Sequence, residues 1–198
     1  MMVAGWRTAL VVIAVGAIGF IAGSLLGTAA AILGGWRERL ILRGVELFIV
    51  VPTLIWALTA AAIFGLSPAT AGVALGLAGV GPYALLSNSL TRRTLAQTYV
   101  HAATALGVSP LRLMLRHVLP NTLPLIFAYV GSQAGQSVVA YASLAFIGLG
   151  ADSSMPDWGA MLYEYRMFVF DDPMLMIWPG LAIAIMTWLL NRIFDRTG

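Results

Sequence analysis

The chain has 198 residues, of which 60% are hydrophobic and 10% are charged, and its formal net charge is +3. A soluble globular domain carries about 25% charged residues, so the composition excludes an ordinary soluble domain and indicates an integral membrane protein. The sequence contains no cysteine, which excludes a disulfide framework, a thiolate metal site and a cysteine nucleophile.

Long apolar segments predict five membrane-spanning helices, over residues 8–33, 45–66, 69–90, 122–147 and 174–190. The first is uncharged over 26 residues, which corresponds to about 39 Å of helix. This run is much longer than the apolar core of a cleaved signal peptide. Small residues at 29 and 31 offer a weak cleavage site, so removal of this segment as a signal peptide stays an alternative. Pro52 and Pro82 lie inside spans, where neighbouring helices can satisfy the freed backbone groups.

The arginine distribution predicts the orientation. Five spans place the termini on opposite sides, and one side then holds nine arginines against two on the other. The 34–44 loop, the 91–120 segment and the C-terminus form the arginine-rich side and are expected in the cytoplasm. The N-terminus and the 148–173 loop are then outside. That loop is acidic through Asp152, Asp157, Glu164, Asp171 and Asp172.

Glycines recur every four residues in several spans, at Gly19, Gly23 and Gly27, at Gly72 and Gly76, and at Gly131 and Gly135. Small residues at this spacing predict close helix packing in lipid, with hinge points as the alternative. Ionisable residues are nearly absent from the spans. Glu46 is interpreted as half of an edge pair with Arg43, three residues earlier. An ion-coupled carrier usually keeps an ionisable residue inside the membrane, so the energy source is expected elsewhere.

Polar side chains gather in the fourth span, at Ser132, Gln133, Gln136, Ser137 and Ser143. Gln133, Gln136 and Ser137 share one helix face. Two interpretations stay open. The side chains form interhelical hydrogen bonds worth ~0.6 kcal/mol each, or they line a path for a polar solute. Asn88 in the third span is similar but lies nearer the cytoplasmic edge.

Residues 95–119 predict a helix, a tight turn and a second helix. The first helix, over 95–106, is rich in alanine, and Gly107 fits the left-handed position that ends many helices. Ser109 fits an N-cap and Pro110 the first helical position. Arg112 and Arg116 lie one turn apart in the second helix. The segment is either an amphipathic helix on the membrane surface or a docking site for a partner protein, which the small alanines suit.

The same segment resembles the cytoplasmic-loop motif of ABC importer permeases. The matching residues stand at the motif's spacing: Ala102, Ala103, Gly107, Leu119 and Pro120. Two positions depart from the general motif, because His101 replaces a glutamate and His117 replaces an apolar residue. Both departures are similar to the dipeptide/oligopeptide/nickel branch of the family, and most of all to the second permease of its operons.

The resemblance continues through residues 142–150, 156–162 and 179–183. Tyr141 departs from the branch, which usually has a glutamate there, and this change would alter the pore lining. The usual first helix of the family is also missing before residue 1. The chain is therefore expected to be a genuine short form, or one with a misplaced or truncated start.

The resemblance implies an all-α membrane bundle of about five transmembrane helices, with the core of a type I importer permease, as a single domain over residues 1–198. Together with a second, related permease, as a heterodimer, the chain would form the pathway for peptides, nickel or related small solutes. Two cytoplasmic ATPase subunits would dock on residues 99–118 of each permease. An extracytoplasmic binding protein would deliver solute to the outer face, where the acidic loop contributes to docking.

Enzymatic activity, a metal and a cofactor are not expected in the chain itself. It has no Gly-rich phosphate loop, so ATP would bind the partner subunits. His101 and His117 lie on separate helices without an acidic ligand and are interpreted as interface residues. The expected location is the plasma membrane of a prokaryote, within the lipid bilayer and with no nucleic-acid partner. A self-contained carrier or channel, and a truncated paralogue that assembles without transporting, stay open as alternatives.

Overall fold

A computed structural model describes residues 2–148 and 155–195, which form helices and turns without a strand, as predicted. In chain order the α-helices are α1 (Met2–Ile18), α2 (Ser24–Leu33), α3 (Gly35–Val50), α4 (Thr53–Phe64), α5 (Pro68–Leu95), α6 (Thr98–Ala105), α7 (Pro110–Leu113), α8 (Leu119–Phe146), α9 (Trp158–Tyr165) and α10 (Met174–Asp195). Two π turns, Gly19–Gly23 and Met114–Val118, join α1 to α2 and α7 to α8, and a 3₁₀ turn, Arg166–Phe168, follows α9.

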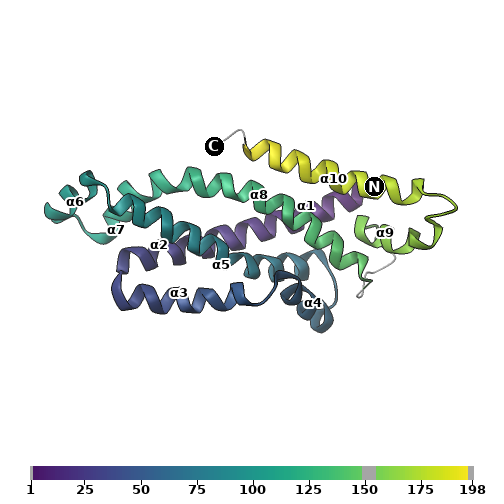
Figure 1. Cartoon of the computed structure of the whole chain (residues 1–198), viewed down its shortest axis with the longest axis horizontal. Helices are drawn as coiled ribbons and strands as arrows, with labels where there is room; N and C mark the ends of the chain where they lie inside the picture. Colours follow the sequence, from purple (N-terminus) through teal and green to yellow (C-terminus); the bar gives the residue numbers. More distant parts are fainter. Residues whose placement is uncertain (1, 149–154, 196–198) are drawn as a thin grey trace.

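The long helices lie side by side in an elongated bundle (Figure 1). α1, α2, α5 and α8 form its middle, with α3 and α4 along one side and α10 along the other. α6 and α7 project from one end, whereas α9 lies at the opposite end near the N-terminus. α10 runs from the α9 end back toward the α6 end. The α6–α7 end and the α9 end are thus separated by the length of the bundle.

Four helical stretches in the described part of the chain are individually long and apolar enough to cross a membrane: Met2–Leu33, Pro68–Leu95, Pro110–Phe146 and Met174–Phe194. The remaining span, predicted over 45–66, is a pair of helices, α3 and α4, bent by 73°. Val51 is extended (φ −84°, ψ 120°) because the ring of Pro52 disfavours a helical residue before it. The bundle therefore has up to five spans, but the prediction of one continuous second helix is wrong.

The segment 34–44, predicted as a loop, is helical from Gly35 onward. Gly34 and Gly35 have φ angles of 61° and 59°, a left-handed conformation that folds α3 back beside α2. The fourth span also begins earlier than expected, because helix runs from Pro110 through Pro120. A proline clashes with the carbonyl four residues before it, and the wider π turn at Met114–Val118 lies at that point.

Close glycine contacts confirm the packing interpretation of the four-residue repeats. A Cβ on Gly27 would collide with the carbonyl group of Ala84, and one on Gly76 would lie 2.9 Å from the Cβ of Ile18. The first contact joins α2 to α5 and the second joins α5 to α1. Gly131 likewise packs against Phe194 of α10. Since lipid supplies no hydrophobic drive between helices, this close approach is a main source of cohesion in the bundle.

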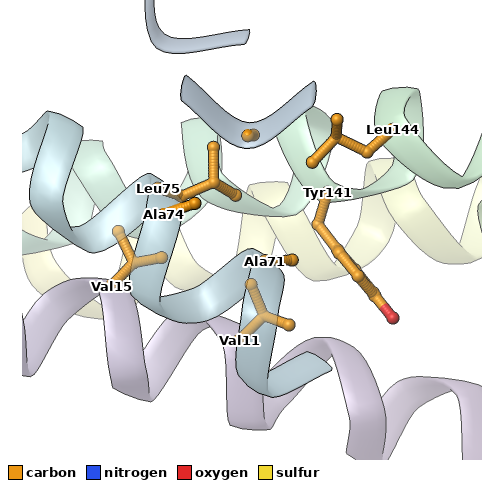
Figure 2. Packing of buried hydrophobic residues seen from close by; sticks show 8 residues of the cluster. Val11, Val15, Ala71, Ala74, Leu75, Tyr141 and Leu144 are labelled. Carbon is orange, nitrogen blue, oxygen red and sulfur yellow. The ribbon is translucent and has the colours of Figure 1, made fainter. Parts of the chain in front are cut away.

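A cluster of buried apolar residues joins four helices at the centre of the fold (Figure 2). Its members are Val11, Val15, Ala57, Ala71, Ala74, Leu75, Tyr141 and Leu144. The cluster connects α1 and α5 to α8, with one contribution from α4. It fixes the face of α8 that turns inward, and so determines which polar residues of α8 remain at the surface.

Candidate functional site

The projecting end of the bundle is a helix–turn–helix unit over residues 98–120, formed by α6, α7, the π turn Met114–Val118 and the first residues of α8, and called here the α6–α7 unit. Gly107 has a φ of 78° and ends α6 as predicted. Its N–H donates to the carbonyl of Thr104 at 3.0 Å, and the N–H of Val108 donates to that of Ala103 at 3.2 Å. These two bonds form a Schellman motif, which satisfies the last carbonyls of the helix. The predicted turn chemistry at this end is therefore confirmed.

The second helix of the unit starts at Pro110, after an extended Ser109 with a ψ of 150°. Ser109 occupies the predicted N-cap position, although its side chain makes no capping hydrogen bond. Val100, Leu113 and Val118 are buried and hold the unit on the bundle. A projecting unit with three buried anchors is a fixed feature of the fold and not a free loop.

Most of the predicted docking residues are exposed on this unit. Those exposed are His101, Ala102, Gly107, Ser109, Pro110, Arg112, Arg116 and Pro120, and those half-buried are Ala103, His117 and Leu119. Leu106, at the apex of the turn, is 85% exposed, and Leu111 and Leu115 are also exposed. These leucines were absent from the predicted set. An apolar residue next to the turn glycine is the signal that would have found Leu106, because an exposed apolar group on a rigid turn suits a partner's pocket.

A buried polar cluster lies where α5 approaches this end. The Asn88 side-chain amide donates to Oε1 of Glu38 at 2.9 Å and to the carbonyl of Gly27 at 3.4 Å. Arg92 Nη1 lies 3.5 Å from the same Glu38 oxygen. The cluster ties α2, α3 and α5 together. Sequence reasoning missed Glu38 because it placed this residue in a cytoplasmic loop. The ion pair expected between Arg43 and Glu46 is not formed in the described part of the chain, where both side chains are exposed.

The polar face of α8 opens into two hollows. The larger, of about 430 Å³, lies among α8, α10 and α4. Its lining residues are Leu54, Ser132, Gly135, Gln136, Val139, Ala140, Ser143, Thr187 and Asn191. The second, of about 160 Å³, includes Gln133, Gln136 and Ser137. Both hollows are lined without a charged side chain, and Gln136 is shared between them.

Two of the predicted pathway residues lie away from these hollows. Asn88 belongs to the buried cluster with Glu38, and Tyr141 belongs to the apolar cluster of Figure 2. The Ser137 and Ser143 hydroxyls donate to carbonyls four residues earlier in their own helix, at 2.7 and 2.8 Å. Gln133, Gln136 and the two serines are therefore the predicted residues that α8 brings together. A pathway role for the whole set stays a prediction.

A second polar cluster lies at the α9 end of the bundle. The Tyr141 hydroxyl interacts with the side chains of Asp157, the residue before α9, and Arg7 of α1. Asp157 is buried and caps α9, where its carboxylate accepts from the N–H of Gly159 at 2.9 Å. The expected acidic docking surface therefore does not include Asp157.

Other acidic residues of this end, Glu164, Asp171 and Asp172, are exposed, and Asp152 lies outside the described residues. Within residues 2–148 and 155–195, no three His, Asp or Glu side chains lie close enough to hold a metal ion. His101 and His117 sit on separate helices of the projecting unit. The ring of His117 lies 6.1 Å from that of Tyr99, a contact that suits packing within the unit.

Comparison with known proteins links this arrangement to transport. Residues 18–197 match the family described as binding-protein-dependent transport system inner membrane component. The glutathione transport system permease protein GsiD of Pectobacterium atrosepticum is 32% identical over 178 residues, which cover 90% of this chain and 59% of the relative. GsiD of Escherichia coli O6:K15:H31 is 33% identical over 161 residues, which cover 81% of this chain and 53% of the relative. The chain thus spans just over half the length of these relatives.

The fold is similar to that of a solved importer. A chain of the MetNI methionine ABC transporter, in an inward-facing conformation, aligns with a TM-score of 0.75 at 19% identity, covering 96% of this chain and 91% of that chain. The arrangement is therefore that of a type I importer permease core, as predicted. The relatives are named as transport permeases and not as enzymes. The family match covers most of the described helices and all but one of the residues that line the two polar hollows, and the chain belongs to the family of binding-protein-dependent transport system inner membrane components.

Proposed function

We propose that the chain is the permease subunit of an ATP-driven importer and that ATPase subunits dock on the α6–α7 unit. One observation carries this proposal. A rigid turn, closed by a Schellman motif and anchored by buried Val100, Leu113 and Val118, presents an almost fully exposed Leu106 at its apex. Leu106 on a fixed turn offers a partner an apolar anchor at little entropic cost. ATP binding would close the partner ATPase pair. α7 would transmit this motion directly into α8, because the π turn Met114–Val118 joins the two helices without a break.

The proposed solute is a peptide or a similar small polar molecule. The relatives named above transport glutathione, which is a small peptide, and their names give nickel no support. The uncharged hollow on α8 and α10 suits amide and hydroxyl groups of a solute. The polar side chains of Gln136 and Ser132 are exposed, and placing them in contact with lipid would cost free energy. This face therefore suits a water-filled path or contact with a second permease.

The proposed assembly follows from the same surfaces. A second, related permease would complete the path along the polar face of α8, most simply as a heterodimer. Two ATPase subunits would bind the α6–α7 units on the cytoplasmic side of a prokaryotic plasma membrane. An extracytoplasmic binding protein would deliver solute at the α9 end, near exposed Glu164, Asp171 and Asp172.

Co-purification with the cognate ATPase tests the docking step. The chain would be expressed with the ATPase and the second permease, as wild type, as Leu106→Ser, and as Gly107→Pro combined with Ala103→Arg. We expect Leu106→Ser to lower the recovered ATPase at least about tenfold, as for loss of an anchor side chain. Leu40→Ser, at an exposed leucine of α3, is the matched control and should recover the ATPase like wild type.

Equal recovery by all variants, or no recovery by a properly inserted wild type, would overturn the docking proposal. Uptake of a radiolabelled glutathione or dipeptide by proteoliposomes that contain the whole assembly tests the transport step separately. Recovery of the ATPase without ATP-dependent uptake of either solute would contradict the peptide-importer proposal. It would also favour the alternative of a paralogue that assembles but does not transport.

A further inference from the structure

A polar hollow of about 360 Å³ lies between the end of α5 and the start of α8. It is separate from the hollows on the polar face of α8, with which it shares no residue. Its lining residues are Leu90, Arg93, Thr94, Gln97, Tyr99, Asn121, Thr122 and Leu125. Arg93 is the charged member of this set, and the predicted orientation places it at the cytoplasmic surface of the membrane.

Two hydrogen-bond donors of this hollow, the Arg93 guanidinium and the Tyr99 hydroxyl, have no acceptor among the described residues, whereas the side chains of Thr94, Gln97, Asn121 and Thr122 each donate to one. Among the side chains that the structure describes, Glu38 forms an ion pair with Arg92. Arg93 has no carboxylate partner among these side chains. The Asn121 amide donates to the Tyr99 hydroxyl oxygen at 3.3 Å and to the carbonyl of His117 at 2.6 Å. Because Tyr99 accepts from Asn121, its own proton is available to a ligand. The hollow therefore presents a guanidinium and a phenolic hydroxyl to the same space.

The surrounding charge favours an anion. The sequence has no acidic residue between Glu46 and Asp152, whereas Arg92, Arg112 and Arg116 lie on neighbouring segments. The carboxylate of Glu38 is already paired with Arg92 and does not offset the other arginines. A ligand that reaches Arg93 would therefore meet a positive potential from the chain. An arginine fork and a hydroxyl are donors that recognise phosphate oxygens.

The hollow is also amphipathic, because Leu90 and Leu125 close its side along the spans. Leu125 is exposed, and Tyr99 is an aromatic residue of the kind that gathers at membrane interfaces. Basic pockets between helices at the cytoplasmic surface suit lipid headgroups. We propose that this hollow binds the phosphate of an anionic phospholipid from the cytoplasmic leaflet, with Arg93 and Tyr99 on the phosphate and the leucines beside the acyl chains. The proposal does not depend on the transport function.

Lipid titration followed by native mass spectrometry tests this site. The purified full-length chain in detergent would be titrated with phosphatidylglycerol, with phosphatidylcholine and with inorganic phosphate. We expect a preference for phosphatidylglycerol, weakened about fivefold in Arg93→Gln, which corresponds to about 1 kcal/mol for one basic residue at an anionic surface. Tyr99→Phe should weaken the same lipid without changing phosphatidylcholine binding. Arg43→Gln removes an exposed arginine of α3, outside the hollow, and is the control for charge alone.

Equal binding of the two lipids would overturn the proposal, and so would an equal loss in Arg43→Gln and Arg93→Gln. Binding of inorganic phosphate that requires Arg93, without a preference between the lipids, would also overturn the lipid assignment and identify a soluble phosphate as the ligand. Arg93 is exposed, and Tyr99→Phe keeps the aromatic ring that contacts His117, so both replacements leave the packing of the bundle intact.

Discussion

The Glu38 carboxylate of α3 binds two residues of α5, Asn88 and Arg92, which differ in environment. Asn88 is buried, and its amide bonds both to Glu38 and to the backbone of Gly27. The Arg92 side chain is 66% exposed, so water and salt screen its ion pair with Glu38. A buried hydrogen bond to a carboxylate is worth more than a screened ion pair. The Asn88 bond should therefore contribute most of the stability of the cluster.

Substitutions in this cluster should follow that order. Glu38→Ala removes the nearer of the two acceptors of the buried Asn88 amide and is expected to lower the free energy of unfolding by about 1–3 kcal/mol. Arg92→Ala should cost less than about 1 kcal/mol, and Glu38→Gln should fall between them because an amide oxygen can still accept from Asn88. Thermal unfolding in detergent measures the three variants. A larger loss in Arg92→Ala than in Glu38→Ala would contradict this ranking.

At the scale of the elements, the contact between α2 and α5 depends on a missing side chain. A methyl group on Gly27 would collide with the backbone of Ala84, so Gly27→Ala must push two long helices apart. We expect a loss of about 1–3 kcal/mol, as for overpacking a close-packed interior. Gly44→Ala in α3 is the matched control, because nothing lies within 4 Å of its Cβ position and alanine favours helix. Unfolding midpoints that fall equally for both variants would show that the close contact is not what stabilises the bundle.

The sequence predicted what depends on local chemistry. The four-residue glycine spacing predicted the packing faces, and Gly107 predicted the end of α6, because both follow from residue size and backbone freedom. Glu38 was missed because its burial depends on α3 folding back to meet Asn88, fifty residues away. Pro52 was expected to be accommodated inside a helical second span, but the chain bends between α3 and α4 at this residue. The size of this bend, 73°, depends on how α4 packs against α5. The spacing of residues along the chain carries no information about that packing.

For the whole molecule, the predicted topology can be tested with single cysteines because the natural chain has none. Leu106→Cys and Phe170→Cys place thiols on the two ends of the bundle, at positions that are 85% and 96% exposed. We expect an impermeant maleimide to label Phe170→Cys in intact cells and Leu106→Cys only after the membrane is opened, because the arginine-rich end should face the cytoplasm. Labelling of Leu106→Cys in intact cells would invert the predicted orientation.

The same cysteine-free background tests whether the polar face of α8 carries water across the assembled molecule. A thiol reacts as its thiolate, which forms readily in water and is disfavoured in apolar surroundings. Gln136→Cys lies where the two hollows meet, whereas Ile185→Cys lies on an exposed face of α10 that lines neither hollow. In the complete assembly, we expect a water-soluble methanethiosulfonate to modify Gln136→Cys at least about tenfold faster than Ile185→Cys, and solute to slow the first reaction alone. If the path runs elsewhere, Gln136 is covered by lipid or by the second permease, and the two cysteines will react equally slowly.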